Sequence, residues 1–261
     1  MKDIPSPRYS AFVAAMARWY IPRFVRRGFH AVRLDCQSVI PPADTPTVIY
    51  LNHPSWWDPL LAGLIACRFY PHHRHYSPID AESLRQYPIM RKLGFFPIQK
   101  YTARGAAEFL QISRNVLREN KAILWVTPQG EFVDSAQRPI FIKPGIGHLA
   151  RDIRPITLVP MAVEYVFWQH RLPEALISLG AAIHAEAQPE QSAAQWTEFL
   201  ARQLERQQDI LRAKAASRSG DGFTTLLAGR SGIGGIYDMR MRRNGERQGL
   251  ETTTHANNTE A

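Results

Sequence analysis

The sequence has 261 residues, 45% of them hydrophobic, which is enough for one large domain with a packed core or for two small domains. Lysine and arginine number 32 against 23 acidic residues, and the net charge of +9 favours an anionic partner such as nucleic acid, a membrane surface or a phosphorylated substrate. No apolar run approaches the roughly 18 residues that cross a bilayer, which excludes a membrane-spanning helix, so any membrane contact is expected to be peripheral.

Cysteine usage indicates the compartment. Cys36 and Cys67 form no CxxC pair, and the chain opens with no signal-peptide pattern. We therefore expect a reduced, cytoplasmic setting, and a protein that lies peripherally on the inner face of the cell membrane.

The N-terminal segment, residues 10–34, mixes aromatic and aliphatic residues with arginines such as Arg18 and Arg23. This composition is typical of a helix that lies in a membrane interface, and Pro22 is expected to break it. An ordinary amphipathic helix, packed on the domain with its arginines in solvent, explains the same pattern. Both interpretations stay open at this point.

Apolar runs and helical spacing alternate along the rest of the chain. Short apolar runs predict strands at residues 47–51, 122–126, 139–142, 156–166 and 175–180. Helical spacing predicts helices at residues 59–69, 103–120 and 192–216, the last with a capping box of Ser192 and Gln195. We expect an α/β fold, with a mixed sheet flanked by helices and preceded by an N-terminal amphipathic, membrane-docking helical segment.

These elements give an expected domain division. Residues 1–44 form the membrane-docking segment, and residues 45–237 form the main domain. Residues 238–261 are polar and carry too little apolar surface to order themselves, so we expect a disordered tail.

The stretch NHPSWWDP follows the first predicted strand and has two interpretations. In the structural one, Asp58 is the N-cap of a helix with Pro59 at its first position, Trp56 and Trp57 are core aromatics, and the histidine is a loop residue without a role. In the functional one, His53 lies close to Asp58, whose carboxylate fixes the imidazole tautomer and raises its basicity.

Further motifs follow in a fixed order. They are GFFPIQK (residues 94–100), VTPQGEF (126–132), FIKPGIGHLA (141–150) and LVPMAVEY (158–165). Together with the Asn-His-x-x-x-x-Asp motif of residues 52–58, this order resembles the glycerolipid acyltransferases, the family that includes bacterial 1-acylglycerol-3-phosphate acyltransferase. The resemblance covers roughly residues 45 to 185 and favours the functional interpretation of NHPSWWDP.

The resemblance implies catalytic and substrate-binding residues. The catalytic pair is His53 and Asp58. The implied substrate-binding residues are Asn52, Gly94, Lys100, Pro128, Gln129, Gly130, Glu131 and Pro160. The sequence also departs from the family pattern, with Lys100 and Phe132 where the family has Arg, Gln129 where it has Glu, and Glu131 where it has Thr.

The resemblance also implies a reaction. His53 is expected to act as the general base toward an acceptor hydroxyl, with acyl-CoA or acyl-carrier-protein as the cosubstrate and no other cofactor. Ser55 is a poor candidate for a nucleophile, because the chain has no Gly-x-Ser-x-Gly elbow. The family's usual acceptor, 1-acylglycerol-3-phosphate, is the first expectation. A less charged lipid alcohol follows closely, because Phe132 and Glu131 leave the motif VTPQGEF without a cation.

The sequence also bears on functions other than acyl transfer. His72, His73 and His75 cluster without a carboxylate or cysteine partner, so we expect no metal. Nucleic acid is not an expected partner, since the chain has no recognised reader motif. Basic residues among aromatics fit a membrane lipid surface better. The alternatives are a non-catalytic lipid-binding protein on the same scaffold, and a thioester hydrolase.

Overall fold

The computed structural model describes residues 7–187 and 190–230, so the expected tail 238–261 and the domain end at 237 lie outside the described residues. Its helices are α1 (Ala11–Gly28), α2 (Asp58–Phe69), α3 (Ala81–Gln86), α4 (Ala103–Leu117), α5 (Gly145–Asp152) and α6 (Ala193–Ala216), with 3₁₀ turns η1 (Pro88–Lys92) and η2 (Ala185–Ala187). Its strands are β1 (Ala31–Asp35), β2 (Thr47–Leu51), β3 (Arg74–Asp80), β4 (Phe95–Ile98), β5 (Ala122–Val126), β6 (Thr157–Val166), β7 (Glu174–Leu179), β8 (Ile183–His184) and β9 (Phe223–Ala228).

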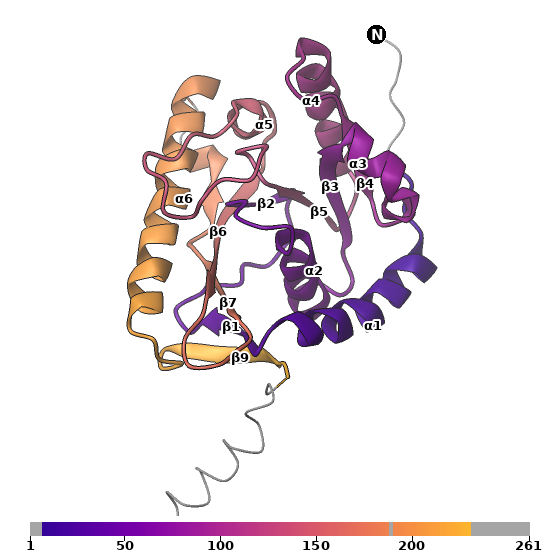
Figure 1. Ribbon diagram of the computed structural model, residues 1–261. Helices are drawn as coiled ribbons and strands as arrows, with labels where there is room; N and C mark the ends of the chain where they lie inside the picture. Colours follow the sequence, from indigo (N-terminus) through magenta and orange to yellow (C-terminus); the bar gives the residue numbers. More distant parts are fainter. Residues whose placement is uncertain (1–6, 188–189, 231–261) are drawn as a thin grey trace, which may run out of the picture.

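The described strands form one nine-stranded sheet in the order β4-β3-β5-β2-β6-β7-β1-β9, with β8 paired to β6. β2 lies in the middle and is parallel to both of its neighbours, β5 and β6. β6 and β7 are antiparallel, as are β1 and β9, so the sheet is mixed. The expected fold class, a mixed sheet flanked by helices, is confirmed (Figure 1).

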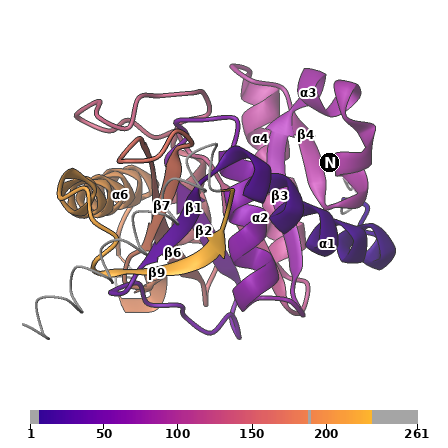
Figure 2. The ribbon, with the colours of Figure 1, turned by 60° about the horizontal axis from the view of Figure 1, so that its bottom comes forward.

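Helices cover both faces of the sheet, which explains why β2 is buried at every position. Ile49 and Leu51 point into a core that includes residues of α2, whereas Val48 and Tyr50 point into a second core that includes residues of α4, α5 and α6. A strand buried on both faces reads as an unbroken apolar run, and TVIYL is such a run. In the rotated view α6 lies at one side of the sheet, with α1 and α4 toward the other (Figure 2).

β1 lies inside the first 44 residues, the segment that the sequence assigns to membrane docking. It pairs parallel with β7 and antiparallel with β9, so residues 31–35 are part of the central sheet. Asp35, at the end of β1, is buried and accepts hydrogen bonds from Ser178 and from Lys214 of α6, at 2.9 and 2.5 Å. Among the described residues, α1 is therefore the helix that remains for the predicted membrane docking.

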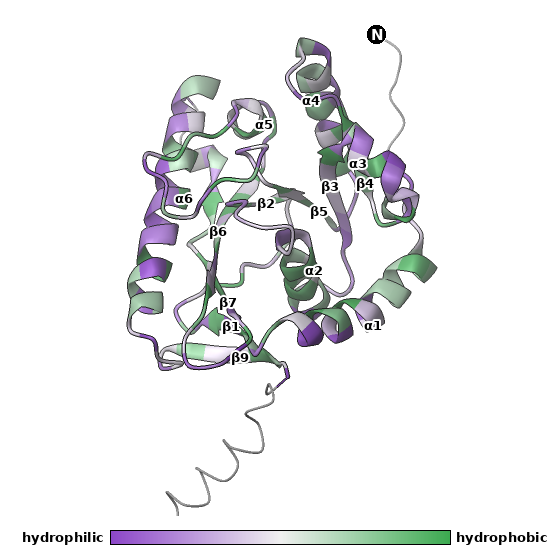
Figure 3. Ribbon diagram, viewed as in Figure 1, coloured by the Kyte–Doolittle hydropathy of each residue, from purple (hydrophilic) through white to green (hydrophobic). Residues whose placement is uncertain are grey.

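α1 is continuous, and the expected break at Pro22 is wrong. A proline inside a helix removes one backbone hydrogen bond and costs about 3 kcal/mol, so other contacts must hold the helix together. The Ser10 side chain caps the N-terminus by accepting from Val13 N. α1 also packs closely on α2, because a Cβ on Gly63 would lie 2.9 Å from Ile21 Cδ1. α1 carries both hydrophobic and hydrophilic residues along its length (Figure 3).

Most of the other predicted elements are confirmed. The strands at 47–51, 122–126, 156–166 and 175–180 correspond to β2, β5, β6 and β7, and the helices at 59–69, 103–120 and 192–216 correspond to α2, α4 and α6. The capping box of Ser192 and Gln195 is present at the start of α6. No helix in the described ranges combines the length and the apolar character that crossing a membrane requires.

The strand predicted at residues 139–142 is wrong, because this stretch is an irregular loop. Pro139 has no N–H to donate, and the backbone N–H of Ile140 donates to Glu205 Oε2 of α6 at 2.7 Å instead of to a strand. Lys143 N donates to Pro128 O at 2.8 Å. Two of the loop's backbone donors thus find partners outside a sheet, while Ile140 is buried in the core.

Candidate active site

The site begins where the central strand β2 ends. The last register pair of β2 and β6 joins Leu51 to Met161. Beyond it, Asn52 Nδ2 donates to Val163 O at 2.9 Å, and Val163 N donates to Asn52 Oδ1 at 2.8 Å. The Asn52 side chain therefore takes the place of the next backbone rung, and it fixes the loop that carries the following residue, His53, against β6.

His53 and Asp58 lie in direct contact. His53 Nδ1 is 2.7 Å from Asp58 Oδ2, and the side chains are 18% and 0% exposed, respectively. With Nδ1 bound to the carboxylate, Nε2 is the nitrogen left for another partner, and it makes no hydrogen bond within residues 7–187 and 190–230. A half-buried imidazole held at Nδ1 by a carboxylate is the arrangement expected of a general base.

Asp58 is not the N-cap of α2, which corrects the sequence-based expectation. The N-cap is Trp57, and Asp58 is the first helical residue, with Pro59 in the first turn as expected. The Asp58 carboxylate does not cap the helix because other groups occupy it. Oδ2 accepts from Ser55 N at 3.0 Å as well as facing His53, and Oδ1 accepts from Tyr165 Oη at 2.6 Å.

Tyr165 is a site residue to which the sequence assigned no role, although it closes the last motif. Burial and the negative charge of Asp58 both raise the pKa of its phenol, so the hydroxyl stays protonated and donates. Tyr165 reaches Asp58 because β6 extends five residues beyond Met161, which is the partner of the last residue of β2. The fully buried carboxylate thus accepts from a phenol and a backbone N–H.

The loop after β5 holds His53 from the other side. Gln129 is buried, and its Oε1 accepts from His53 N at 3.0 Å. Val133 N donates to His53 O at 3.0 Å. Both backbone groups of His53 are therefore bound to the loop after β5. Gln129 serves this purpose through its amide oxygen, which is an acceptor at every pH.

Phe132 lies against the His53 ring, with ring centroids 4.5 Å apart and planes at 44°. Aromatic contacts also lead away from this loop. Trp57 packs on Phe24 of α1 at 5.6 Å, and the exposed Trp56 lies 6.3 Å from the same ring. Apolar side chains therefore border His53 and connect its loop to α1.

Glu131 lines a small cavity, and Gly130 directly precedes it in the chain. Gly130 has a φ of +75°, and a Cβ there would lie 2.5 Å from Lys143 Nζ, so the lysine passes directly over this glycine. Tyr101 connects the two charges, because it donates to Glu131 Oε2 at 3.2 Å and its ring lies 4.5 Å from Lys143 Nζ. Gln129, Glu131, Phe141 and Lys143 are among the residues that line a cavity of about 280 Å³.

The other implied substrate-binding residues have different surroundings. Gly94 has a φ of +88°, and a Cβ there would lie 2.2 Å from His75 O, so the glycine permits η1 to approach β3 closely. Pro160 is buried in the middle of β6, where it pairs with Tyr50. Pro128 is buried and accepts from Lys143 N. Lys100 is exposed after β4. Of the implied catalytic and substrate-binding residues, the structure brings Asn52, His53, Asp58 and Gln129 together around His53.

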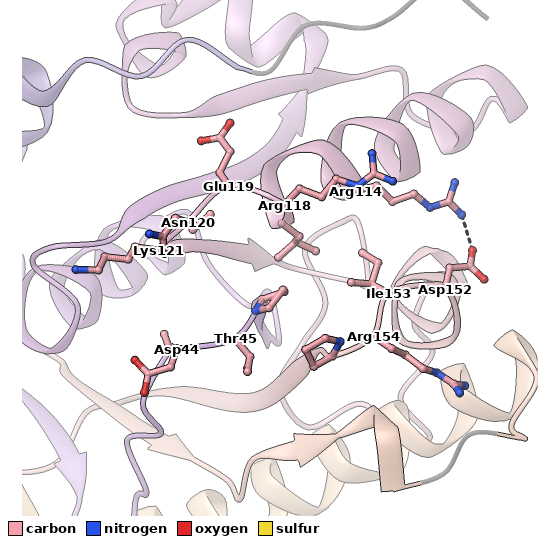
Figure 4. A pocket seen from close by; sticks show the side chains of 15 residues that line it. Asp44, Thr45, Arg114, Arg118, Glu119, Asn120, Lys121, Asp152, Ile153 and Arg154 are labelled. Carbon is pink, nitrogen blue, oxygen red and sulfur yellow. Dashed lines mark hydrogen bonds and ion pairs between the residues drawn. The ribbon is translucent and has the colours of Figure 1, made fainter.

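A cavity of about 440 Å³ lies at the opposite end of the central strands (Figure 4). It is bordered by residues that precede β2 and β6 and by the end of α4, including Thr45, Arg118 and Arg154. These are the amino ends of parallel strands, whereas His53 follows a carboxyl end. Binding sites of open α/β sheets lie at carboxyl ends, so this cavity is separate from the site at His53.

The histidine cluster at residues 72–75 has partners of its own. Trp125 Nε1 donates to His75 Nδ1 at 3.1 Å, so Nε2 carries the proton and donates to Tyr70 O at 3.1 Å. Burial lowers the pKa of His75 to about 4, which keeps the ring neutral. Both ring nitrogens of His75 therefore serve the core and not a ligand.

Comparison with known proteins gives this geometry a context. The 1-acyl-sn-glycerophosphate (LPA) acyltransferase PlsC from Thermotoga maritima has a similar fold, with a TM-score of 0.53 and 15% sequence identity over 77% of this chain and 80% of that one. No curated protein matches the sequence significantly. The sequence model of the Acyltransferase family matches residues 32–164, just over half of the chain. The match includes every residue of the His53 loop and of the loop after β5, and the chain belongs to the acyltransferase family.

Proposed function

We propose that the protein transfers a fatty acyl chain from a thioester donor to the hydroxyl of a lipid acceptor, with His53 as the general base. The observation that carries the proposal is the 2.7 Å contact between His53 Nδ1 and a fully buried Asp58. Acyl transfer is the reaction of the family to which the chain belongs. A fully buried carboxylate that contacts the imidazole can orient the ring and stabilise the imidazolium that forms during the reaction.

In the proposed reaction, His53 Nε2 accepts the proton of the acceptor hydroxyl while the oxygen attacks the thioester carbonyl. The imidazolium that forms is stabilised by Asp58 through Nδ1–H. Collapse of the tetrahedral intermediate breaks the C–S bond, and His53 returns its proton to the departing thiolate. The products are an ester and a free thiol, with no acyl-enzyme in between.

Ser55 is not the nucleophile in this proposal. Its Oγ accepts from Trp57 N at 3.2 Å, which ties it into the turn before α2. Its backbone N–H donates to Asp58, so Ser55 supports the carboxylate. The donor is an acyl-CoA or an acyl-carrier-protein, since both present a thioester and leave as a thiol.

A lysophospholipid of the 1-acylglycerol-3-phosphate type is the first acceptor, on the family resemblance. A less charged lipid alcohol is the second candidate, and the contact between Phe132 and His53 favours it. An aromatic ring there gives an acceptor apolar contact where a guanidinium would bind phosphate. Lys143 is the cation beside Gly130, and it lies over the ring of Tyr101. Glu131 accepts a hydrogen bond from the hydroxyl of the same Tyr101, so its negative charge offsets that of Lys143.

The surface of α1 supports a membrane-bound acceptor. Its exposed large side chains, Phe12, Met16, Trp19 and Tyr20, recur at helical spacing. Exposed arginines follow on the same helix, which suits an interface with anionic lipid. We propose that this face docks the protein peripherally, on the inner face of the cell membrane, so that the lipid acceptor reaches His53 without leaving the bilayer entirely.

The test is thiol release from acyl-CoA with lysophosphatidate in vesicles, measured for the wild type and for His53→Ala. We expect the variant to lose on the order of 10²-fold to 10⁴-fold in rate while melting normally. His72→Ala is the matched control, because that histidine is exposed and lies outside the site. Equal turnover of a folded His53→Ala protein would refute the proposal. Lipid binding without turnover in the wild type would indicate a non-catalytic lipid-binding protein, and thiol release without acceptor would indicate a hydrolase.

A further inference from the structure

Three side chains with metal-binding groups meet at the end of the sheet that carries β1 and β7. They are His30, just before β1, His170, in the connection from β6 to β7, and Glu174, the first residue of β7. One nitrogen of each imidazole and one carboxylate oxygen all lie within 4.8 Å of one another. The two imidazoles stack, with ring centroids 3.5 Å apart and planes at 19°.

The backbone sets this arrangement firmly. His30 N donates to Pro173 O at 2.8 Å, and His30 O accepts from Gly229 N at 2.7 Å. The next residue, Ala31, pairs with Glu174 in the parallel ladder of β1 and β7. Glu174 therefore lies in a strand and His30 directly before the adjacent, hydrogen-bonded strand, so the spacing of these two residues does not depend on a free loop.

One atom of the cluster is without a partner. His30 Nδ1 is buried and makes no hydrogen bond within the described residues. Leaving a buried polar atom unpaired is unfavourable, so its persistence needs an explanation. A ligand that accepts a lone pair would satisfy this nitrogen.

We propose that His30, His170 and Glu174 form a binding site for a divalent transition-metal ion, and that Zn²⁺ fits it best. Two imidazole nitrogens and one carboxylate oxygen are ligands that Zn²⁺ prefers, with water as the fourth. In tetrahedral coordination with bonds of about 2.0–2.2 Å, ligand atoms lie roughly 3.4 Å apart. The three ligand atoms, which lie within 4.8 Å of one another, must therefore come closer together to bind one ion. Opening the stacked rings would provide this movement.

Arg33 has a defined place in this site. Its guanidinium donates to Glu174 Oε2, which leaves Oε1 for the ion. Carboxylates that bind metals commonly accept a hydrogen bond of this kind, which orients them. The arginine's charge also opposes the ion, so the site is weaker than a zinc-finger site and its occupancy depends on the metal concentration.

A bound ion would join three parts of the fold. It would tie the end of α1 and the start of β1 to the connection between β6 and β7. Phe29, the neighbour of His30, stacks on Tyr165 at 5.8 Å and contacts Trp57 at 4.8 Å, so the ion would also steady the residues behind Asp58. We expect a structural effect, with thermal stability that rises with Zn²⁺.

The test uses the full chain stripped with a chelator and titrated with Zn²⁺ in a calorimeter. We expect one equivalent to bind the wild type and its melting temperature to rise. His30→Ala and His170→Ala should each lose that equivalent and the rise, whereas His72→Ala should keep both. Co²⁺ is the spectroscopic probe, because a nitrogen- and oxygen-bound ion gives visible absorption that both cluster variants should lack.

Two results would overturn the proposal. One is a stripped wild type that binds no Zn²⁺, and the other is equal Zn²⁺ uptake by the wild type and by folded His170→Ala, which would place the ion elsewhere. His170 lies in a connection between strands, so its variant tests the site even where His30→Ala fails to fold. Activity plays no part in these measurements, so their outcome is independent of acyl transfer at His53.

Discussion

Tyr165 Oη lies 2.6 Å from Asp58 Oδ1, although the two residues are 107 positions apart in the chain. The opposite oxygen of the same carboxylate faces His53 Nδ1 and Ser55 N. Asp58 is completely buried, so its charge depends on these hydrogen bonds in place of water. Tyr165 therefore acts through Asp58 as a positioning residue for His53.

Replacing Tyr165 with Phe should lower kcat about 10-fold and leave KM nearly unchanged, because the lost bond to a charged group, worth about 1.5–3 kcal/mol, holds the carboxylate and not the substrate. Steady-state kinetics at saturating acceptor measure this. Tyr70→Phe is the matched control, since it removes a buried bond of 2.9 Å to Pro41 O away from the site. A similar fall in kcat in both variants would show that general loosening, and not Asp58, is responsible.

Substitutions of Asn52 are expected to lower the stability of the fold. Asn52→Leu leaves both backbone groups of Val163 unpaired and should lower the free energy of unfolding by about 1–3 kcal/mol for each of them. Asn52→Asp keeps the acceptor for Val163 N but faces Val163 O with an oxygen, so it also weakens the end of the ladder. Urea unfolding gives the two values. A Leu variant as stable as the wild type would contradict the role of Asn52 as a rung.

The acceptor prediction depends on Phe132 and Glu131. Changing Phe132 to Arg and Glu131 to Thr restores the family's usual residues, and it should raise the use of lysophosphatidate relative to uncharged lipid alcohols. The measurement is kcat/KM over a panel of acceptors with one acyl donor. The wild type should use uncharged acceptors comparably well. Strong lysophosphatidate preference in the wild type, unimproved by the double change, would refute the interpretation of Phe132.

The α1 prediction concerns vesicle binding. Phe12→Ser with Trp19→Ser should release the protein from anionic vesicles, because both side chains are exposed on α1 and their loss removes apolar area at the interface. Binding by the wild type should weaken with salt, by about 1 kcal/mol for each basic residue near the surface. Co-sedimentation measures both effects. Phe167→Ser, which removes an equally exposed aromatic residue at the end of β6, is the control and should still sediment.

Stability should fall in weak acid because of His75. Burial holds its pKa at about 4 in the folded chain, below the ordinary value of 6.5, so protons bind the unfolded chain more readily. The contribution of neutral His75 to the free energy of unfolding is complete above pH 6.5, and it is lost as the pH falls from 6.5 toward 4. Unfolding by urea across this range should show a smaller fall in His75→Gln than in the wild type. His72→Gln, exposed and nearby, should follow the wild type.

The sequence was most informative where a structure depends on neighbours in the chain. The five-residue spacing of His53 and Asp58 spans one turn between a strand and a helix, so the pair meets whatever the remaining topology is. Tyr165 could not be predicted, because its position depends on the register of β2 with β6. The same holds for Gln129, whose amide reaches His53 N from another loop.

The missed and mistaken elements have physical causes as well. β1 carries Arg33 within its run, and β9 is partly exposed, so neither has the unbroken apolar character of β2. The PIFI stretch has that character, but its backbone is bound by Glu205 and its sequence begins with proline. A four-residue apolar run is compatible with a strand and with a buried loop. In this protein Glu205 of α6 accepts the hydrogen bond of Ile140 N, and the stretch is a loop.

The position of β1 between β7 and β9 has a consequence for synthesis on the ribosome. β1 ends at residue 35, whereas its partners span Glu174–Leu179 and Phe223–Ala228. At about 5–20 residues per second, the nascent chain carries this strand for roughly ten seconds or longer before either partner exists. Both of its backbone edges are open during that interval, with Val32 and Leu34 lacking their native cover. Slower elongation prolongs this exposure, so aggregation of nascent chains should increase when translation is slowed between β1 and β7.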